Sequence, residues 1–283
     1  MSLIRIDRPA FEQRFLECAR KHLPPEPASE PTESYQPSSQ ATSPPARLSL
    51  QGAITALNLA SGLTGLPLVA LTAQEAAREL VTPAQEGQLA DTRLRGYADR
   101  LTSDERVQQS WEKVSQLLPG AGSAPKVVDL SLVYAEADSR EMYVGKQALQ
   151  GDLASDEVLI FTLAHEEAHR RHRDSAGTAG LEALLEVAPG RESFQALRDG
   201  WHSNELQADL VGAEVAARAG CDPKPILAFL LSCPEDMQHP SGARRAEVVR
   251  ERMAELGAVI SEAELAALED RMTALRPGEK GSV

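Results

Sequence analysis

Two histidines four residues apart, with a glutamate directly after the first, are the residues of this chain best suited to metal chemistry. They are His165, Glu166 and His169, within the run Val158–His172. On an α-helix both imidazoles share one face and can bind one ion. Imidazole suits zinc, and a catalytic zinc site uses three protein ligands with water in the fourth position. Glu166, about 100° further round the helix, can reach that water. We expect a zinc site with Glu166 as the general base; the alternative is a pair of surface histidines at helical spacing.

A third ligand is expected from the segment that begins at Asn204. Glu205 and Asp209 share a helical face there, and the small residues Gly212 and Ala216 extend that face. Small residues let two helix backbones approach closely, which would bring Glu205 to the metal. Asp209, one turn on, would orient a liganding histidine through its other ring nitrogen. The alternative is an ordinary solvated acidic face.

With these motifs the chain resembles the zinc metallopeptidases that include the CAAX prenyl protease, the HtpX-type proteases and their soluble relatives. That family pairs His-Glu-x-x-His with a downstream Glu-x-x-x-Asp, and the matching positions are His165, Glu166, His169, Glu205 and Asp209. The resemblance implies a zincin-like metalloprotease fold and one zinc ion per chain.

The resemblance continues beyond the metal motifs and covers about Thr82 to Leu256. Ala219–Pro223 looks like the family's turn, and the segment from His239 to Arg245 looks like its His-Pro-x-x-x-x-Arg element. By this analogy, His239 and Arg245 would lie over the active site and contact the substrate or charge formed on the scissile carbonyl. Without the resemblance, a helix-start His-Pro and a solvated Arg would be the simpler interpretation.

One segment departs from the family pattern. Relatives carry an Asn-Ala-Phe-like run with glycines before the strand that precedes the catalytic helix, whereas this chain has Val133–Glu141. The edge that aligns the substrate is therefore expected to differ, and substrate preference does not transfer.

The helix that must present the histidines is well specified. Ser155 is a candidate N-cap, Asp156 and Glu157 are acidic residues in the first turn, and near-continuous apolar residues run to Ala164. This pattern predicts one helix that is buried along most of its length, with its chemistry at the carboxyl-terminal end.

Two strands and a connection are expected around this helix. Lys126–Tyr134 alternates enough for a strand, and Glu141–Lys146 would pair with it as a small sheet beside the active-site helix. Its exposed edge would bind a peptide by strand addition. Ala176–Trp201 is interpreted as a loop-rich connection with a short helix around Leu181–Val187, and Glu247–Leu275 as a terminal helical run.

The segment 48–74 contains no charged residue and is long enough to cross a bilayer. Its hydroxyl and amide side chains, three glycines and Pro67 disfavour a spanning helix. We expect two short helices, broken at Gly62–Pro67, that pack on the rest of the chain or lie on a membrane surface.

Composition suggests five segments. They are an amphipathic segment (1–23), a disordered Pro/Ser-rich linker (24–47), an apolar helical segment (48–74), a region (75–275) that the resemblance identifies as a zinc metalloprotease domain, and a loose tail (276–283). A formal net charge of −13 argues against nucleic acid as a partner. Cys18, Cys221 and Cys233 imply no disulfide framework. The amino-terminal segment lacks the apolar core of a secretory signal, so we expect a cytoplasmic protein; peripheral membrane association and non-classical secretion are the alternatives.

Together these features predict an α+β protein, mostly helical, that hydrolyses peptide bonds in protein substrates with one zinc ion per chain. Two alternatives stay open. One is a catalytically silent binding or chaperone-like module that keeps the zinc fold. The other is a protease held latent by its amino-terminal segment.

Overall fold

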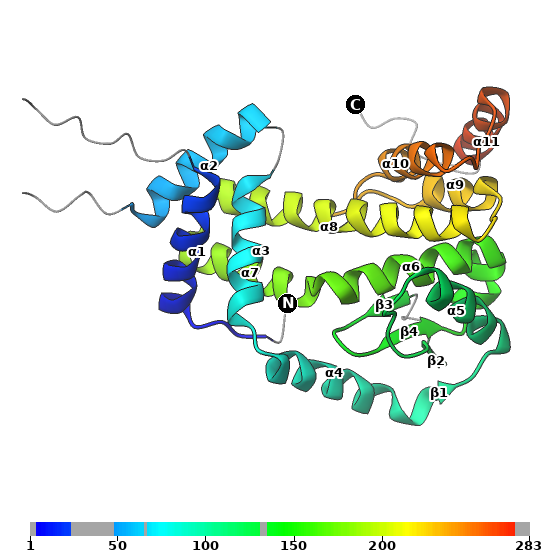
Figure 1. Cartoon of the computed structure of the whole chain (residues 1–283), viewed down its shortest axis with the longest axis horizontal. Helices are drawn as coiled ribbons and strands as arrows, with labels where there is room; N and C mark the ends of the chain where they lie inside the picture. Colours follow the sequence, from blue (N-terminus) through cyan, green and yellow to red (C-terminus); the bar gives the residue numbers. More distant parts are fainter. Residues whose placement is uncertain (1–3, 24–47, 65–66, 131–134, 275–283) are drawn as a thin grey trace, which may run out of the picture. The chain divides into compact units, whose positions relative to one another are not determined.

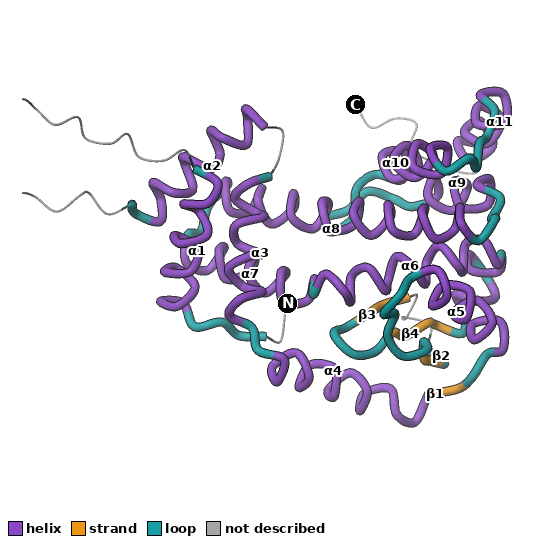
Figure 2. The backbone as a smooth tube through the Cα atoms, viewed as in Figure 1, coloured by secondary structure: helices purple, strands orange, loops and turns teal. Residues whose placement is uncertain are grey.

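The computed structural model describes residues 4–23, 48–64, 67–130 and 135–274 (Figure 1). In this part of the chain helices dominate and short strands form a small mixed sheet (Figure 2). The expected α+β class with mostly helical content is therefore confirmed. The predicted linker 24–47 and the predicted tail 276–283 lie outside the described residues.

The chain divides into two compact units. The first contains the described parts of residues 1–81 together with 177–200, and the second contains those of 82–176 and 201–283. This division differs from the expected boundary at residue 75, because an internal segment joins the amino-terminal helices in one unit.

The first unit is a bundle of helices. It comprises α1 (Arg8–His22), α2 (Leu50–Thr64), α3 (Leu68–Leu80), most of α7 (Asp174–Val187) and the start of α8 (Arg191–Arg218). The two helices predicted in 48–74 are confirmed. Taken singly, none of the described helices has both the length and the apolar character to cross a membrane; α2 and α3 have them jointly but are bent by 120° at their break.

The expected loop-rich connection at 176–201 was wrong, because this stretch is helical in α7 and α8. Gly177, Gly180 and Gly200 lie at close helix contacts, and Gly190 lies in the turn between α7 and α8. A Cβ atom at Gly180 would lie 2.4 Å from the carbonyl oxygen of Ala73 and 2.5 Å from Cβ of Ala77. Only a residue without a side chain allows α7 to approach α3 this closely.

The second unit contains the remaining helices. They are α4 (Pro83–Tyr97), α5 (Glu105–Leu117), α6 (Asp156–His172), the rest of α8, α9 (Pro223–Ser232), α10 (Gly242–Glu255) and α11 (Glu262–Ala274), with 3₁₀ turns at Ala98–Arg100, Ala148–Gln150 and Asp152–Ala154. The terminal run predicted as one helix is two helices. They are separated at Gly257, whose φ of 88° lies in the left-handed region.

The sheet lies in the second unit and has the order β1-β2-β4-β3 among the described residues. Its strands are β1 (Leu101–Thr102), β2 (Lys126–Val128), β3 (Ala135–Ala137) and β4 (Met142–Gly145). The predicted pairing of the two longer segments is confirmed, since β2 and β4 run parallel. β1 and β3 were not predicted, because two or three residues carry too little alternation. The end of the predicted strand, residues 131–134, lies outside the described residues.

Helix α6 crosses the core of the second unit, as predicted. Ser155 caps it by accepting a hydrogen bond from the backbone N–H of Val158 at 3.3 Å. Its apolar residues, including Leu159 and Leu163, are fully buried among side chains from α5, α9 and α10. The burial fixes the helix, so its polar carboxyl-terminal turns are held in a defined orientation.

Candidate metal centre

The predicted metal ligands converge from α6 and α8. The Nε2 atoms of His165 and His169 are 3.0 Å apart. One carboxylate oxygen of Glu205 lies 3.3 Å from Nε2 of His169, and the other lies 3.5 Å from Nε2 of His165. The three ligand atoms are within 4.8 Å of one another, so one ion can contact all of them.

Close packing of the two helices makes this convergence possible. A Cβ atom at Gly212 of α8 would lie 2.8 Å from Cε2 of Phe161 and 3.0 Å from its carbonyl oxygen. Ala216, one turn further, is fully buried. The small-residue face that the sequence predicted is therefore in contact with α6, two turns of α8 beyond Glu205.

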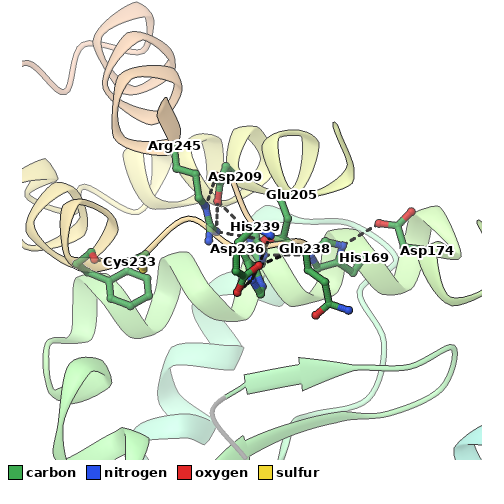
Figure 3. Close-up of polar contacts among 11 residues, drawn as sticks. His169, Asp174, Glu205, Asp209, Cys233, Asp236, Gln238, His239 and Arg245 are labelled. Atoms are coloured by element: carbon green, nitrogen blue, oxygen red, sulfur yellow. Dashed lines mark hydrogen bonds and ion pairs between the residues drawn. The ribbon is translucent and has the colours of Figure 1, made fainter. Parts of the chain in front are cut away.

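Each histidine is backed by a carboxylate on its other nitrogen. Nδ1 of His169 donates to a carboxylate oxygen of Asp174 at 2.8 Å (Figure 3). Nδ1 of His165 lies 3.0 Å from a carboxylate oxygen of Asp209, an ion-pair distance without a hydrogen-bonding angle. With Nδ1 facing a carboxylate, each ring turns Nε2 toward the other and toward Glu205, as in metal sites where outer carboxylates orient the histidine ligands.

Arg245 contacts two acidic residues of the site, Asp209 and Glu205. Its guanidinium donates to both carboxylate oxygens of Asp209, at 2.7 and 2.8 Å, and approaches Glu205 at 3.5 Å (Figure 3). Asp209 is fully buried and Arg245 is 6% exposed. Two short, parallel hydrogen bonds in a dry site fix both side chains. By the resemblance, Arg245 was expected to contact the substrate or charge formed on the scissile carbonyl; in the structure its guanidinium pairs with Asp209 and approaches Glu205.

Buried charges shift the pKa values of the candidate ligands. Burial alone would lower the pKa of His169, but the hydrogen bonds with Asp174 and Glu205 raise it well above its usual value. Burial opposes the charge of Glu205 as well, and contacts with the two histidines hold its pKa well below the usual range. The contact between the two residues thus favours the charged form of His169 and keeps Glu205 anionic.

Glu166 faces a pocket beside the ligands. The pocket has a volume of about 450 Å³ and is bordered by His165, Glu205 and apolar side chains that include Phe161 and Phe229. Burial, followed by the nearby Glu205 charge, raises the pKa of Glu166 against the lowering effect of the histidines. A carboxylate with a raised pKa is a better proton carrier near neutral pH.

His239 borders the same pocket from the segment between α9 and α10. Its Nδ1 lies 3.0 Å from both carboxylate oxygens of Asp236. Asp236 also accepts backbone N–H groups from Gln238 and His239, each at 2.7 Å (Figure 3). Its carbonyl oxygen lies 3.2 Å from Nε2 of His202. These contacts hold the His239 ring by Nδ1 and leave Nε2 as its other polar atom.

The sequence identified the candidate metal ligands but not two carboxylates of the site: Asp174, which contacts His169, and Asp236, which contacts His239. Asp174 is five residues beyond His169, which on a continuous helix puts it on another face, so the helical spacing argued against it. Asp236 precedes His239 by three residues, a common turn spacing that gave a weak signal.

Comparison of the chain with models of known protein families found no match. A comparison with curated protein sequences likewise found no match.

Proposed function

We propose that this chain is a zinc-dependent endopeptidase of a zincin-like kind. The observation that carries the proposal is the convergence of the His165 and His169 Nε2 atoms on the Glu205 carboxylate, with Glu166 beside them in a pocket. Two imidazoles and one carboxylate are a donor set that zinc hydrolases use. The carboxylates behind both rings add to the fit.

His165, His169 and Glu205 would hold the zinc. When bound, zinc supplies a Lewis acid that polarises the scissile carbonyl and lowers the pKa of a water toward ~7. Glu166 accepts one proton from the attacking water as the water oxygen bonds to the carbonyl carbon. It then gives that proton to the amide nitrogen as the C–N bond breaks, so no covalent intermediate with the protein forms.

The other polar residues have separate tasks in this mechanism. Arg245 pairs with Asp209, which faces His165, and it also approaches the carboxylate of Glu205. Arg245 and Asp209 therefore hold His165 and Glu205 in place. His239, held at Nδ1 by Asp236, donates from Nε2 to the oxygen that gains charge in the transition state. A positioned donor of this kind is worth about 10²–10³-fold in kcat.

The border of the pocket suits an extended peptide. Ala135 of β3 lines the pocket, and β3 is an end strand of the sheet among the described residues. The free edge of an end strand binds a peptide backbone by strand addition. Phe161 and Phe229 then offer an apolar surface to one substrate side chain.

Cleavage of an unfolded protein such as casein tests the proposal. Glu166→Gln should keep the fold and the zinc but lose about 10²–10⁴-fold in rate, because only proton transfer is removed. Glu157→Gln, at the opposite end of the same helix, is the matched control and should cleave like the parent. Equal cleavage by the parent and Glu166→Gln would sink the proposal. A parent that holds zinc without turnover would make the chain a binding module.

A further inference from the structure

The junction between α6 and α7 has an unusual backbone. Arg173 has φ 56° and ψ 47°, and within the described ranges no other residue except glycine has a positive φ. Glycine is the usual residue in this left-handed position after a helix, because a Cβ atom is crowded there. A long side chain at this position therefore calls for a function of that side chain.

The left-handed turn places Asp174 against the metal centre. Successive residues of an α-helix are separated by about 100°, so a residue five positions beyond His169 on a continuous helix would lie about 140° away from it. The turn at Arg173 instead brings the Asp174 carboxylate to 2.8 Å from Nδ1 of His169. The contact that orients this histidine thus depends on the backbone conformation of one residue.

The side chain of Arg173 is fixed by Glu86 of α4. Nε of Arg173 donates to both carboxylate oxygens of Glu86, at 3.1 and 3.2 Å, and Nη2 donates at 3.0 Å. Glu86 is 5% exposed, so this ion pair is shielded from water on one side. A glycine would adopt the turn more easily but could not make this contact.

We propose that Glu86 and Arg173 are positioning residues of the metal centre, acting through Asp174. The ion pair holds the left-handed turn, the turn holds the Asp174 carboxylate on Nδ1 of His169, and that carboxylate makes Nε2 a better-oriented and more basic ligand. The inference rests on the proposed metal site and is independent of peptide hydrolysis.

Zinc affinity of the full-length protein tests this, measured by competition with a chromogenic chelator. Asp174→Asn should weaken zinc binding by about 10–100-fold. Glu86→Gln and Arg173→Gly should each weaken it by roughly 3–10-fold. Asp91→Asn is the matched control, since it breaks an exposed ion pair between α4 and Arg140 and should leave affinity unchanged. If Glu86→Gln does not fold, Arg173→Gly removes the same pair with a residue that favours the turn.

A double variant separates positioning from general support of the fold. If Glu86 acts through Asp174, Glu86→Gln adds no further loss of zinc affinity in the Asp174→Asn background. Full additivity, or an unchanged affinity in both single variants at Glu86 and Arg173, would overturn the inference. A parent without zinc would overturn both it and the proposed function. A parent protein that binds zinc but cleaves no substrate would contradict only the proposed peptidase activity.

Discussion

Among the residues that the structure describes, two clusters each bring three possible metal ligands together, one in each unit. Cys18, Glu75 and Glu79 form the first, and His165, His169 and Glu205 form the second. In both, the ligand atoms lie within 4.8 Å of one another. Proximity alone therefore does not distinguish the two clusters. The charges around each cluster do.

The first cluster is already neutralised. Lys21 contacts the carboxylate of Glu75 and lies 3.5 Å from that of Glu79, and Arg14 lies 3.0 Å from Glu79. Burial, with the nearby Glu75 charge, raises the pKa of the Cys18 thiol to about 11, so the thiol keeps its proton at neutral pH. A metal ion would have to displace cations and a proton.

The second cluster is arranged in the opposite way. Anionic Asp174 and Asp209 stand behind the imidazoles, and Arg245 pairs mainly with Asp209. The Nε2 atoms of His165 and His169 both point toward the carboxylate of Glu205. A cation site is therefore distinguished by where its counter-charges lie.

The largest effect on folding is expected from Arg245→Met. It leaves the fully buried Asp209 charge without its guanidinium partner, which typically costs about 3–5 kcal/mol. Lys21→Met, in the more exposed cluster, should have a much smaller effect because water screens its ion pairs. Urea unfolding of the zinc-free proteins measures both. A loss from Arg245→Met no greater than that from Lys21→Met would contradict the buried-pair account.

Asp209→Asn is expected to weaken zinc binding by about 10–100-fold, because it removes the charge behind His165. Glu79→Gln makes the same chemical change in the first cluster and should not alter zinc affinity. Chelator competition on both variants gives the answer. Equal zinc affinity of the Asp209→Asn and Glu79→Gln variants would show that the carboxylate behind His165 has no influence on metal binding.

The convergence of His165, His169 and Glu205 could be predicted from the sequence because these residues follow helical spacing. His165 and His169 are one turn apart on a helix with a clear cap, and Gly212 marks the close approach of α8. Asp174 was missed because its position depends on a left-handed turn at Arg173, a conformation that residue type disfavours. Local patterns predict regular helices, and they do not predict a strained junction held by a distant glutamate.

The pH dependence of stability should differ between the zinc-free and zinc-loaded protein. The pKa of His169 in the folded protein is raised above its unfolded value of 6.5. Its contribution to the stability of the zinc-free protein is thus complete below about pH 6.5 and is lost as pH rises through the raised pKa. Zinc binds neutral imidazole, so its affinity rises over the same range.

The measurement is the zinc-induced increase in Tm at about pH 6 and about pH 8. We expect the larger increase at the higher pH, because ligand stabilisation grows with affinity. The same increase at both values would mean that zinc binding does not displace a proton from these histidines.

The smallest effect is expected from Cys18→Ser. The thiol is fully buried and protonated, and serine has nearly the same size. Zinc content, measured by elemental analysis, should stay equal to that of the parent. A clear decrease would place part of the bound metal in the first cluster.

The internal segment 177–200 shows why the division into units was not predicted. Its glycines and alanines have the composition of a loop, but Gly177 and Gly180 pack against α3. Glycine and alanine occur both in turns and at close helix contacts, so composition alone does not distinguish the two. Only the identity of the packing partner, which a single sequence does not give, separates the two.

The zinc content of the purified full-length protein decides whether His165, His169 and Glu205 bind the metal. We expect about one zinc per chain in the parent and in Glu75→Gln, and none in a His165→Ala/His169→Ala double variant that keeps its helical circular dichroism. Equal zinc in the parent and in the double variant, or a parent without zinc, would contradict this assignment.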